Sequence, residues 1–126
     1  AEHPAHLLRL ADGRILFTFG IRIGKRGVGA RFSDDEGASW SKPRILVRCK
    51  RASDGGYPSS CQMADGTIVT AYYTNRIDAH ARYHMGVVRW LPSSKNCCAT
   101  TRVEWLDGAG SAVATCAVGT VRVGRP

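Results

Sequence analysis

Residues 33–40 read SDDEGASW, and this stretch decides the fold. It fits the pattern Ser/Thr-x-Asp-x-Gly-x-x-Trp, in which Asp35 accepts hydrogen bonds from backbone N–H groups about two residues further on. Gly37 supplies a positive φ, and Trp40 folds back as an apolar plug. With four specified positions, a chance match in a chain this long is on the order of one in a thousand. Together with Ser33, these residues predict a self-contained turn that closes a β-hairpin.

Strand-like segments flank this turn. Four short runs, rich in β-branched or aromatic residues, are separated by turn sequences such as Asp12-Gly13. They cover residues 6–10, 14–21, 27–33 and 44–48. No stretch of ten or more residues before residue 92 carries a 3.6-residue apolar period. We therefore expect an antiparallel meander of four strands and no helix.

The first hairpin recurs further along the chain. Residues 4–16 (PAHLLRLADGRIL) are echoed by residues 58–69 (PSSCQMADGTIV). In each copy the second strand continues into aromatic residues, Phe17 and Phe19 in the first and Tyr72 and Tyr73 in the second. The Asp-Gly turns begin at Asp12 and Asp65, so the spacing is 65 − 12 = 53 residues, near the roughly 40–50 residues of a propeller blade. With a third strand at 83–90, the repeat predicts two four-stranded blades, at about residues 4–50 and 57–92.

The last part of the chain differs in composition. Residues 93–126 are rich in Ala, Gly, Val, Thr and Arg, contain three of the five cysteines and hold no further copy of the repeat. Residues 102–106 and 113–123 favour strands by propensity. A last strand, a poorly ordered extension and an out-of-frame translation of GC-rich DNA all fit this atypical tail.

Charge and composition indicate the class of partner. The 18 Lys and Arg against 10 Asp and Glu give a formal charge of +8, carried mostly by arginine, whose planar fork suits carboxylate or phosphate. The basic residues are scattered singly, which disfavours nucleic acid, and no apolar run reaches the ~20 residues of a membrane helix. The start at Ala1, without Met or a signal-peptide pattern, predicts that the chain begins inside something larger or after processing.

Cysteines and histidines give no metal signal. The five cysteines are an odd number without CxxC spacing, and the histidine pairs, three and four residues apart, lie on no expected helix. We read the acidic cluster of Asp34, Asp35 and Glu36 as scaffold rather than as a metal site. No metal and no cofactor is therefore expected.

The 33–40 pattern resembles the Asp-box of sialidases and bacterial neuraminidase-repeat proteins, and the resemblance covers about residues 2–92. It implies an all-β fold in which the chain forms two consecutive blades of an incomplete, six-bladed β-propeller. In that family the Asp-box joins the third and fourth strands of a blade, on the face away from the active site. The resemblance therefore implies a structural role for Ser33, Asp35, Gly37 and Trp40.

A second stretch is similar to the last catalytic region of exo-sialidases. It comprises DGGYPSSCQ at residues 54–62, DGTI at 65–68 and AYY at 71–73. By this resemblance Tyr57 matches the nucleophilic tyrosine, which suits a substrate whose carboxylate on the anomeric carbon would repel an acidic nucleophile. Arg26, with Arg22 as its rival, matches the third of the arginines that bind that carboxylate.

The chain also departs from the family. It has Tyr72-Tyr73-Thr74 where the family has Leu-Tyr-Glu, and the other catalytic residues come from earlier blades that this chain does not contain. Two blades cannot close a ring. We therefore expect a fragment of a sialidase-like glycoside hydrolase for an acidic sugar, inactive alone and dependent on further blades or on self-association. A non-catalytic module that binds glycans or proteins, and a truncated non-functional product, are the alternatives. Secretion or a periplasmic location is implied only by analogy with bacterial sialidases.

Overall fold

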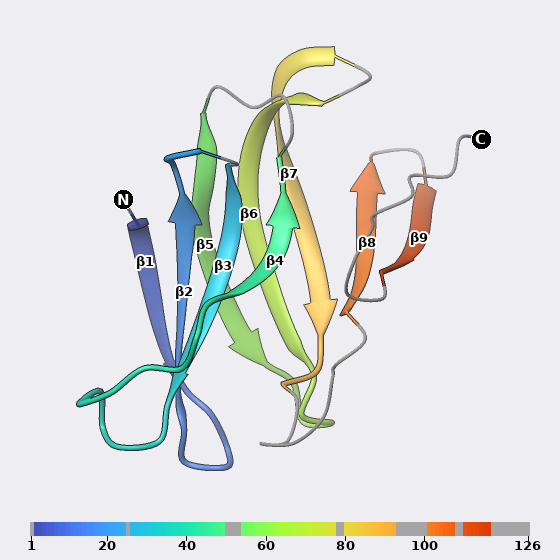
Figure 1. Ribbon diagram of the computed structural model, residues 1–126. Helices are drawn as coiled ribbons and strands as arrows, with labels where there is room; N and C mark the ends of the chain where they lie inside the picture. The colour runs from blue at the N-terminus through green and yellow to red at the C-terminus, as the bar shows by residue number, and fades with distance from the viewer. Residues whose placement is uncertain are drawn as a thin grey trace.

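The computed structural model describes residues 2–24, 26–49, 54–77, 80–92, 101–107 and 110–116. Within these ranges the chain forms strands and turns and no helix. The strands make two antiparallel sheets that stand beside each other (Figure 1). The expectation of an all-β fold is confirmed.

Each sheet follows the order of the chain. The first sheet consists of β1 (Glu2–Arg9), β2 (Ile15–Ile21), β3 (Gly27–Ser33) and β4 (Arg44–Arg48). The second sheet consists of β5 (Gly55–Gln62), β6 (Ile68–Ile77), β7 (His80–Trp90), β8 (Thr101–Asp107) and β9 (Gly110–Cys116). Every neighbouring pair is antiparallel, so both sheets are simple meanders.

The four strands expected around the 33–40 turn are all present in the first sheet. The second sheet differs from the expected four-stranded unit because two strands from the tail, β8 and β9, extend it beyond β7. The expected tail strand at 113–123 begins earlier, in β9, and the part of it after residue 116 lies outside the described residues. Propensity located these two strands but gave no sign of which sheet they join.

The two Asp-Gly turns repeat each other bond for bond. In the first, the Gly13 N–H donates to the Leu10 carbonyl at 3.0 Å, and the Arg14 N–H donates to the Asp12 carboxylate at 3.1 Å. In the second, residues 63–67 make the same two bonds at 2.9 Å each. The two glycines have φ of 86° and 82°. The repeat in the sequence is therefore also a repeat of backbone geometry.

A ring lying across a glycine also recurs in both sheets. Phe19 on β2 pairs with Gly29 on β3, and Tyr72 on β6 pairs with Gly86 on β7. A Cβ added at Gly29 would lie 2.6 Å from the Phe19 ring, and one added at Gly86 would lie 2.4 Å from the Tyr72 ring. Both positions need glycine because the ring occupies the space of a side chain.

The core lies between the sheets, where β1 and β2 lie against β5. One face of the first sheet and the facing side of the second sheet form this core. The buried apolar residues that pack together there are Leu10, Leu16, Val28, Ala30, Phe32, Leu46, Val47, Ile68, Tyr72, Val88 and Trp90. Phe19, which is 1% exposed, is buried outside this cluster. The rings of Phe32 and Trp90 meet edge to face at 6.0 Å, which joins the two sheets.

A chain of buried polar groups crosses the core. The Ser60 hydroxyl lies 3.1 Å from the Thr18 hydroxyl of the first sheet and 2.9 Å from the Thr70 hydroxyl of its own sheet. The Trp90 indole N–H donates to Thr70 Oγ1 at 3.0 Å. Because buried polar groups are costly when unpaired, these bonds fix the relative placement of the sheets.

Candidate functional site

The two ends of the sheets carry different chemistry. The Asp-Gly turns and the Ser33–Trp40 turn lie at the lower end in Figure 1. The opposite end collects the last residues of β2 and β6 and the first residues of β5 and β7 (Figure 1). Tyr57 and Arg22 lie at this upper end, so the end away from the Ser33–Trp40 turn holds the candidate site.

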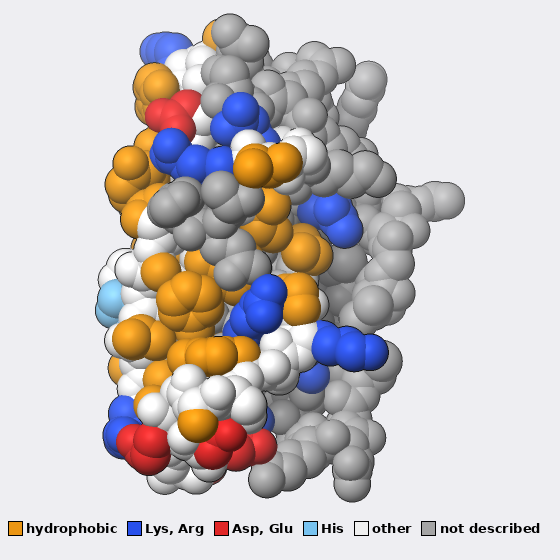
Figure 2. All heavy atoms as spheres, turned by 60° about the vertical axis from the view of Figure 1, so that its left-hand side comes forward, with side chains coloured by type: hydrophobic (Ala, Val, Ile, Leu, Met, Phe, Trp, Pro, Cys, Tyr) orange, Lys and Arg blue, Asp and Glu red, His pale blue; other side chains and the backbone are white. Residues whose placement is uncertain are grey.

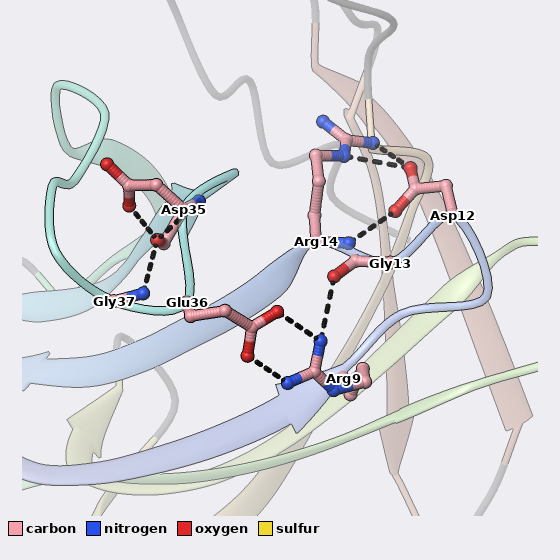
Figure 3. Close-up of polar contacts among 8 residues, drawn as sticks. Arg9, Asp12, Gly13, Arg14, Asp35, Glu36 and Gly37 are labelled. Carbon is pink, nitrogen blue, oxygen red and sulfur yellow. Dashed lines mark hydrogen bonds and ion pairs between the residues drawn. The ribbon is translucent and has the colours of Figure 1, made fainter.

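The Ser33–Trp40 turn joins β3 to β4 and is held by two side chains (Figure 3). Asp35 accepts a bond from the Ser39 N–H at 2.8 Å, four residues on rather than about two as expected. The Ser33 hydroxyl accepts from the Gly37 N–H at 2.8 Å and donates to Asp35 at 2.8 Å. Glu36 and Gly37 both have positive φ, of 58° and 92°.

The charge of Asp35 stabilises this turn. Hydrogen bonds from the Ser39 hydroxyl and N–H and from the Ser33 hydroxyl lower the pKa of Asp35 to about 2. Trp40 packs on Phe17 of β2, with ring centroids 5.4 Å apart, but 36% of it stays exposed. The expected plug is therefore a partial cover on the sheet surface.

An ion pair connects this turn to the first hairpin. Arg9 at the end of β1 donates to Glu36 through both terminal nitrogens, one of them at 2.8 Å (Figure 3). The same side chain donates to the Gly13 carbonyl at 3.2 Å. Asp35 and Glu36 thus bond to groups of their own chain. Both partners of the Arg9–Glu36 pair are exposed, so the pair adds little stability.

Tyr57 lies in an irregular part of β5. The register with β6 shifts between Gly56 and Ser59, and Tyr57 has a φ of 48°, which is uncommon for a residue with a side chain. Its side chain is 51% exposed, and its ring lies 5.1 Å from that of Tyr73. The bulge therefore presents an open aromatic side chain at the upper end of the sheets.

Arg22, not Arg26, meets Tyr57 in this structure. The Arg22 guanidinium lies 5.0 Å from the centre of the Tyr57 ring, a cation–π distance. Arg26 stands just before β3, where its carbonyl accepts a bond from the Cys49 N–H at 2.9 Å. The Nε of Arg22 is shielded from solvent and has no hydrogen-bond partner within the described part of the chain.

Asp54 organises the site, and sequence reasoning did not single it out. Its carboxylate accepts bonds from Arg22 at 3.0 Å, Tyr73 at 3.0 Å and Tyr83 at 3.3 Å, and from the Gly55 N–H at 2.9 Å. Two of these donors, Arg22 and Tyr73, are the side chains that contact the Tyr57 ring. Asp54 therefore holds in place the two side chains that contact the Tyr57 ring.

The pKa values at this end follow from these bonds. Burial raises the pKa of Asp54, but the bonds from Tyr73 and Gly55 and the charge of Arg22 outweigh it, so the pKa is lowered overall. Burial and the bond to Asp54 raise the pKa of Tyr73. The carboxylate stays ionised and the Tyr73 phenol stays protonated near neutral pH, which keeps their hydrogen bond intact.

The site combines one cationic side chain with three phenol rings. Among the described residues no group of three or more His, Cys, Asp or Glu side chains is placed to hold a metal ion, and no helix there is long and apolar enough to span a membrane. Arg22 supplies a cation, while Tyr57, Tyr73 and Tyr83 supply rings, with the last two 5.8 Å apart. The signal for Asp54 in the sequence was weak: it was an acidic residue just before Gly-Gly-Tyr.

A comparison with models of protein families found no match, and none of the curated proteins compared with the chain matches it.

Proposed function

We propose that this chain is part of a sialidase-like glycoside hydrolase that takes an acidic sugar at the end of the sheets formed by Arg22, Asp54, Tyr57, Tyr73 and Tyr83. The observation that carries the proposal is the contact between Arg22 and Tyr57, which are 57 − 22 = 35 residues apart in the sequence. A carboxylate-binding arginine beside a tyrosine is the pair that the resemblance implies. The two sheets are, on this proposal, adjacent blades of an incomplete propeller.

Two further features support this proposal. The Ser33–Trp40 turn joins the third and fourth strands of the first sheet, the place of the Asp-box in a blade. It also lies at the end opposite Tyr57, as a structural Asp-box does relative to an active site. In addition, Asp54 holds Arg22 through a carboxylate, although Thr74 stands where the family has a glutamate that steadies an arginine.

The isolated chain should bind but not hydrolyse. A phenol becomes a nucleophile when a base takes its proton, yet among the described residues the Tyr57 hydroxyl makes no hydrogen bond. The nearby carboxylate of Asp54 is already occupied by Arg22, Tyr73 and Tyr83. The same observation favours the second candidate, a non-catalytic module that binds acidic glycans with these side chains.

The test of binding is an NMR titration of the chain with N-acetylneuraminic acid and with its methyl ester. The free acid should shift resonances of Arg22 and Tyr57, and the ester should not, because esterification removes the negative charge. Arg22→Lys keeps the charge but loses the planar fork, so we expect about tenfold weaker binding. Arg48→Lys, on the exposed end of β4, is the matched control and should bind as the wild type does.

Equal binding of acid and ester, or full binding by Arg22→Lys, would contradict the proposed site. A hydrolysis assay tests the prediction that the isolated chain is inactive. A fluorogenic sialoside should release no fluorophore with the isolated chain, and release that is lost in Tyr57→Phe would show that the chain is catalytic on its own.

A further inference from the structure

We propose that a second copy of this chain packs the outer face of its first sheet against the outer face of the second sheet, repeating the contact that the two sheets make within one chain. The outer face of the first sheet is defined by Leu7, Phe17, Trp40 and Ile45. The outer face of the second sheet is defined by Val69, Ala71, Met85 and Val87. This inference does not depend on the sugar site.

The internal repeat supplies the argument. Residues of β1 and β2 correspond to residues of β5 and β6 at an offset of 53, as the two Asp-Gly turns show. Across the second and third strands, Ile15 of β2 pairs with Ser33 of β3, and Ile68 of β6 pairs with Trp90 of β7. On the third strands Ser33 therefore corresponds to Trp90, at an offset of 90 − 33 = 57. The pairs Phe19–Gly29 and Tyr72–Gly86 obey the same two offsets.

These correspondences show that the two sheets turn opposite, non-equivalent faces toward each other. Ser60 of the second sheet faces the first sheet and is only 6% exposed, whereas its counterpart Leu7 is 60% exposed. Val28 of the first sheet is fully buried, but its counterpart Met85 is 63% exposed. Each outer face is thus the repeat equivalent of a face that is already packed inside the molecule.

Both outer faces also carry exposed apolar side chains, among them Leu7, Ile45 and Met85. Leu7 pairs with Phe17 across β1 and β2, and Trp40 packs on Phe17 at 5.4 Å. Figure 2, in which the β1 side of the molecule comes forward, shows hydrophobic side chains gathered on this surface. On the second sheet, Val87 pairs with Ala71 and Met85 with Tyr73. Extended apolar surface of this kind marks interaction sites.

A second copy of the chain fits both faces at once. The outer face of the first sheet is the repeat equivalent of the inner face of the second sheet, and the outer face of the second sheet is the equivalent of the inner face of the first. Such a contact is heterologous, because different surfaces of the two copies meet, and it continues from copy to copy until a ring closes. The charge of +8 on every copy opposes the contact, so salt should strengthen it by screening.

The test uses one blocking variant for each face. Leu7→Glu blocks the first sheet's outer face, and Met85→Glu blocks that of the second sheet. Both residues are exposed, so both variants should fold. Ile23→Glu, at an exposed apolar residue in the β2–β3 hairpin, is the control with the same change in charge. Masses are measured by light scattering and sedimentation velocity between about 10 and 200 µM, with circular dichroism to verify folding.

We expect wild type and Ile23→Glu to form assemblies larger than a monomer, and each blocking variant alone to be monomeric. A mixture of the two blocking variants should form a one-to-one dimer, since each retains the face that the other has lost. A monomeric wild type, blocking variants that assemble as the wild type does, or a mixture that stays monomeric would each overturn the proposal. If a glutamate variant is unfolded, Leu7→Gln and Met85→Gln replace the pair with the same expected outcomes.

Discussion

The first and second sheets share a hairpin, an Asp-Gly turn and a ring across a glycine, yet their surroundings differ. Phe19 of the first sheet lies on its outer face beside Phe17, with centroids 5.4 Å apart, whereas Tyr72 of the second sheet is enclosed between the sheets. The same arrangement of a ring across a glycine therefore occurs on an outer face in the first sheet and between the sheets in the second. The repeat therefore buries the ring in both sheets, while the neighbouring sheet determines which residues surround it.

A second difference concerns acidic residues. Asp35 in the first sheet bonds to Ser33 and Ser39, within four residues of itself. Asp54 at the start of the second sheet bonds to Arg22, 54 − 22 = 32 residues away, and to Tyr83, 83 − 54 = 29 residues away. The first aspartate stabilises a turn, whereas the second joins the two sheets.

The largest expected effect tests the two glycines against each other. In Gly86→Ala the added methyl group meets Tyr72, which has no free space to move into, so the free energy of unfolding should fall by about 2–3 kcal/mol. In Gly29→Ala the methyl group meets the Phe19 ring, which is only 1% exposed, so the loss should also be about 2–3 kcal/mol. Urea unfolding followed by circular dichroism measures both. A clearly smaller loss for Gly29→Ala would show that the Phe19 ring has room to move that the Tyr72 ring lacks.

The next effect tests the polar chain across the core. Thr70→Val keeps the shape of the side chain but leaves the Trp90 indole N–H without its acceptor, so the loss should be about 1–3 kcal/mol. Thr18→Val, on the first sheet, removes one partner of Ser60, which still has Thr70, so about 0.5–1.5 kcal/mol should be lost. The same urea experiment compares them. A larger loss for Thr18→Val would mean that the hydrogen bond of Ser60 to Thr18 contributes more to stability than the hydrogen bond of Trp90 to Thr70.

Sequence reasoning predicted the local features of this molecule well. The strands of the first sheet and both Asp-Gly turns depend on residues close in sequence, so propensity and turn chemistry located them. The face that each sheet buries depends on which sheet stands next to it, and the Asp54 cluster needs Arg22 and Tyr83 brought from two other segments. Neither follows from a local pattern. For the same reason the sequence ranked Arg26 ahead of Arg22, although the structure places Arg22 beside Tyr57.

The smallest expected effect concerns Asp35 and acid. Its pKa in the folded chain is about 2, below the ordinary value of roughly 3.9 for an unfolded aspartate. The unfolded chain therefore takes up a proton first as the pH falls, and the stabilisation from the Asp35 carboxylate is complete above about pH 4 and is lost as the pH falls through about 2. Since other carboxylates also have lowered pKa values, the quantity to measure is the difference between the wild type and Asp35→Asn.

That difference in urea midpoint, determined at pH 6, 4, 3 and 2, should be small at pH 6, slightly lower at pH 4, and should shrink toward zero at pH 2. Glu36→Gln serves as the control for charge, because Glu36 bonds to Arg9 rather than to its own turn. A difference that stays constant down to pH 2 would mean that the Ser33–Trp40 turn does not depend on the charge of Asp35. In that case the hydrogen bonds of Ser33 and the positive φ of Gly37 would be sufficient to hold the turn of the first sheet.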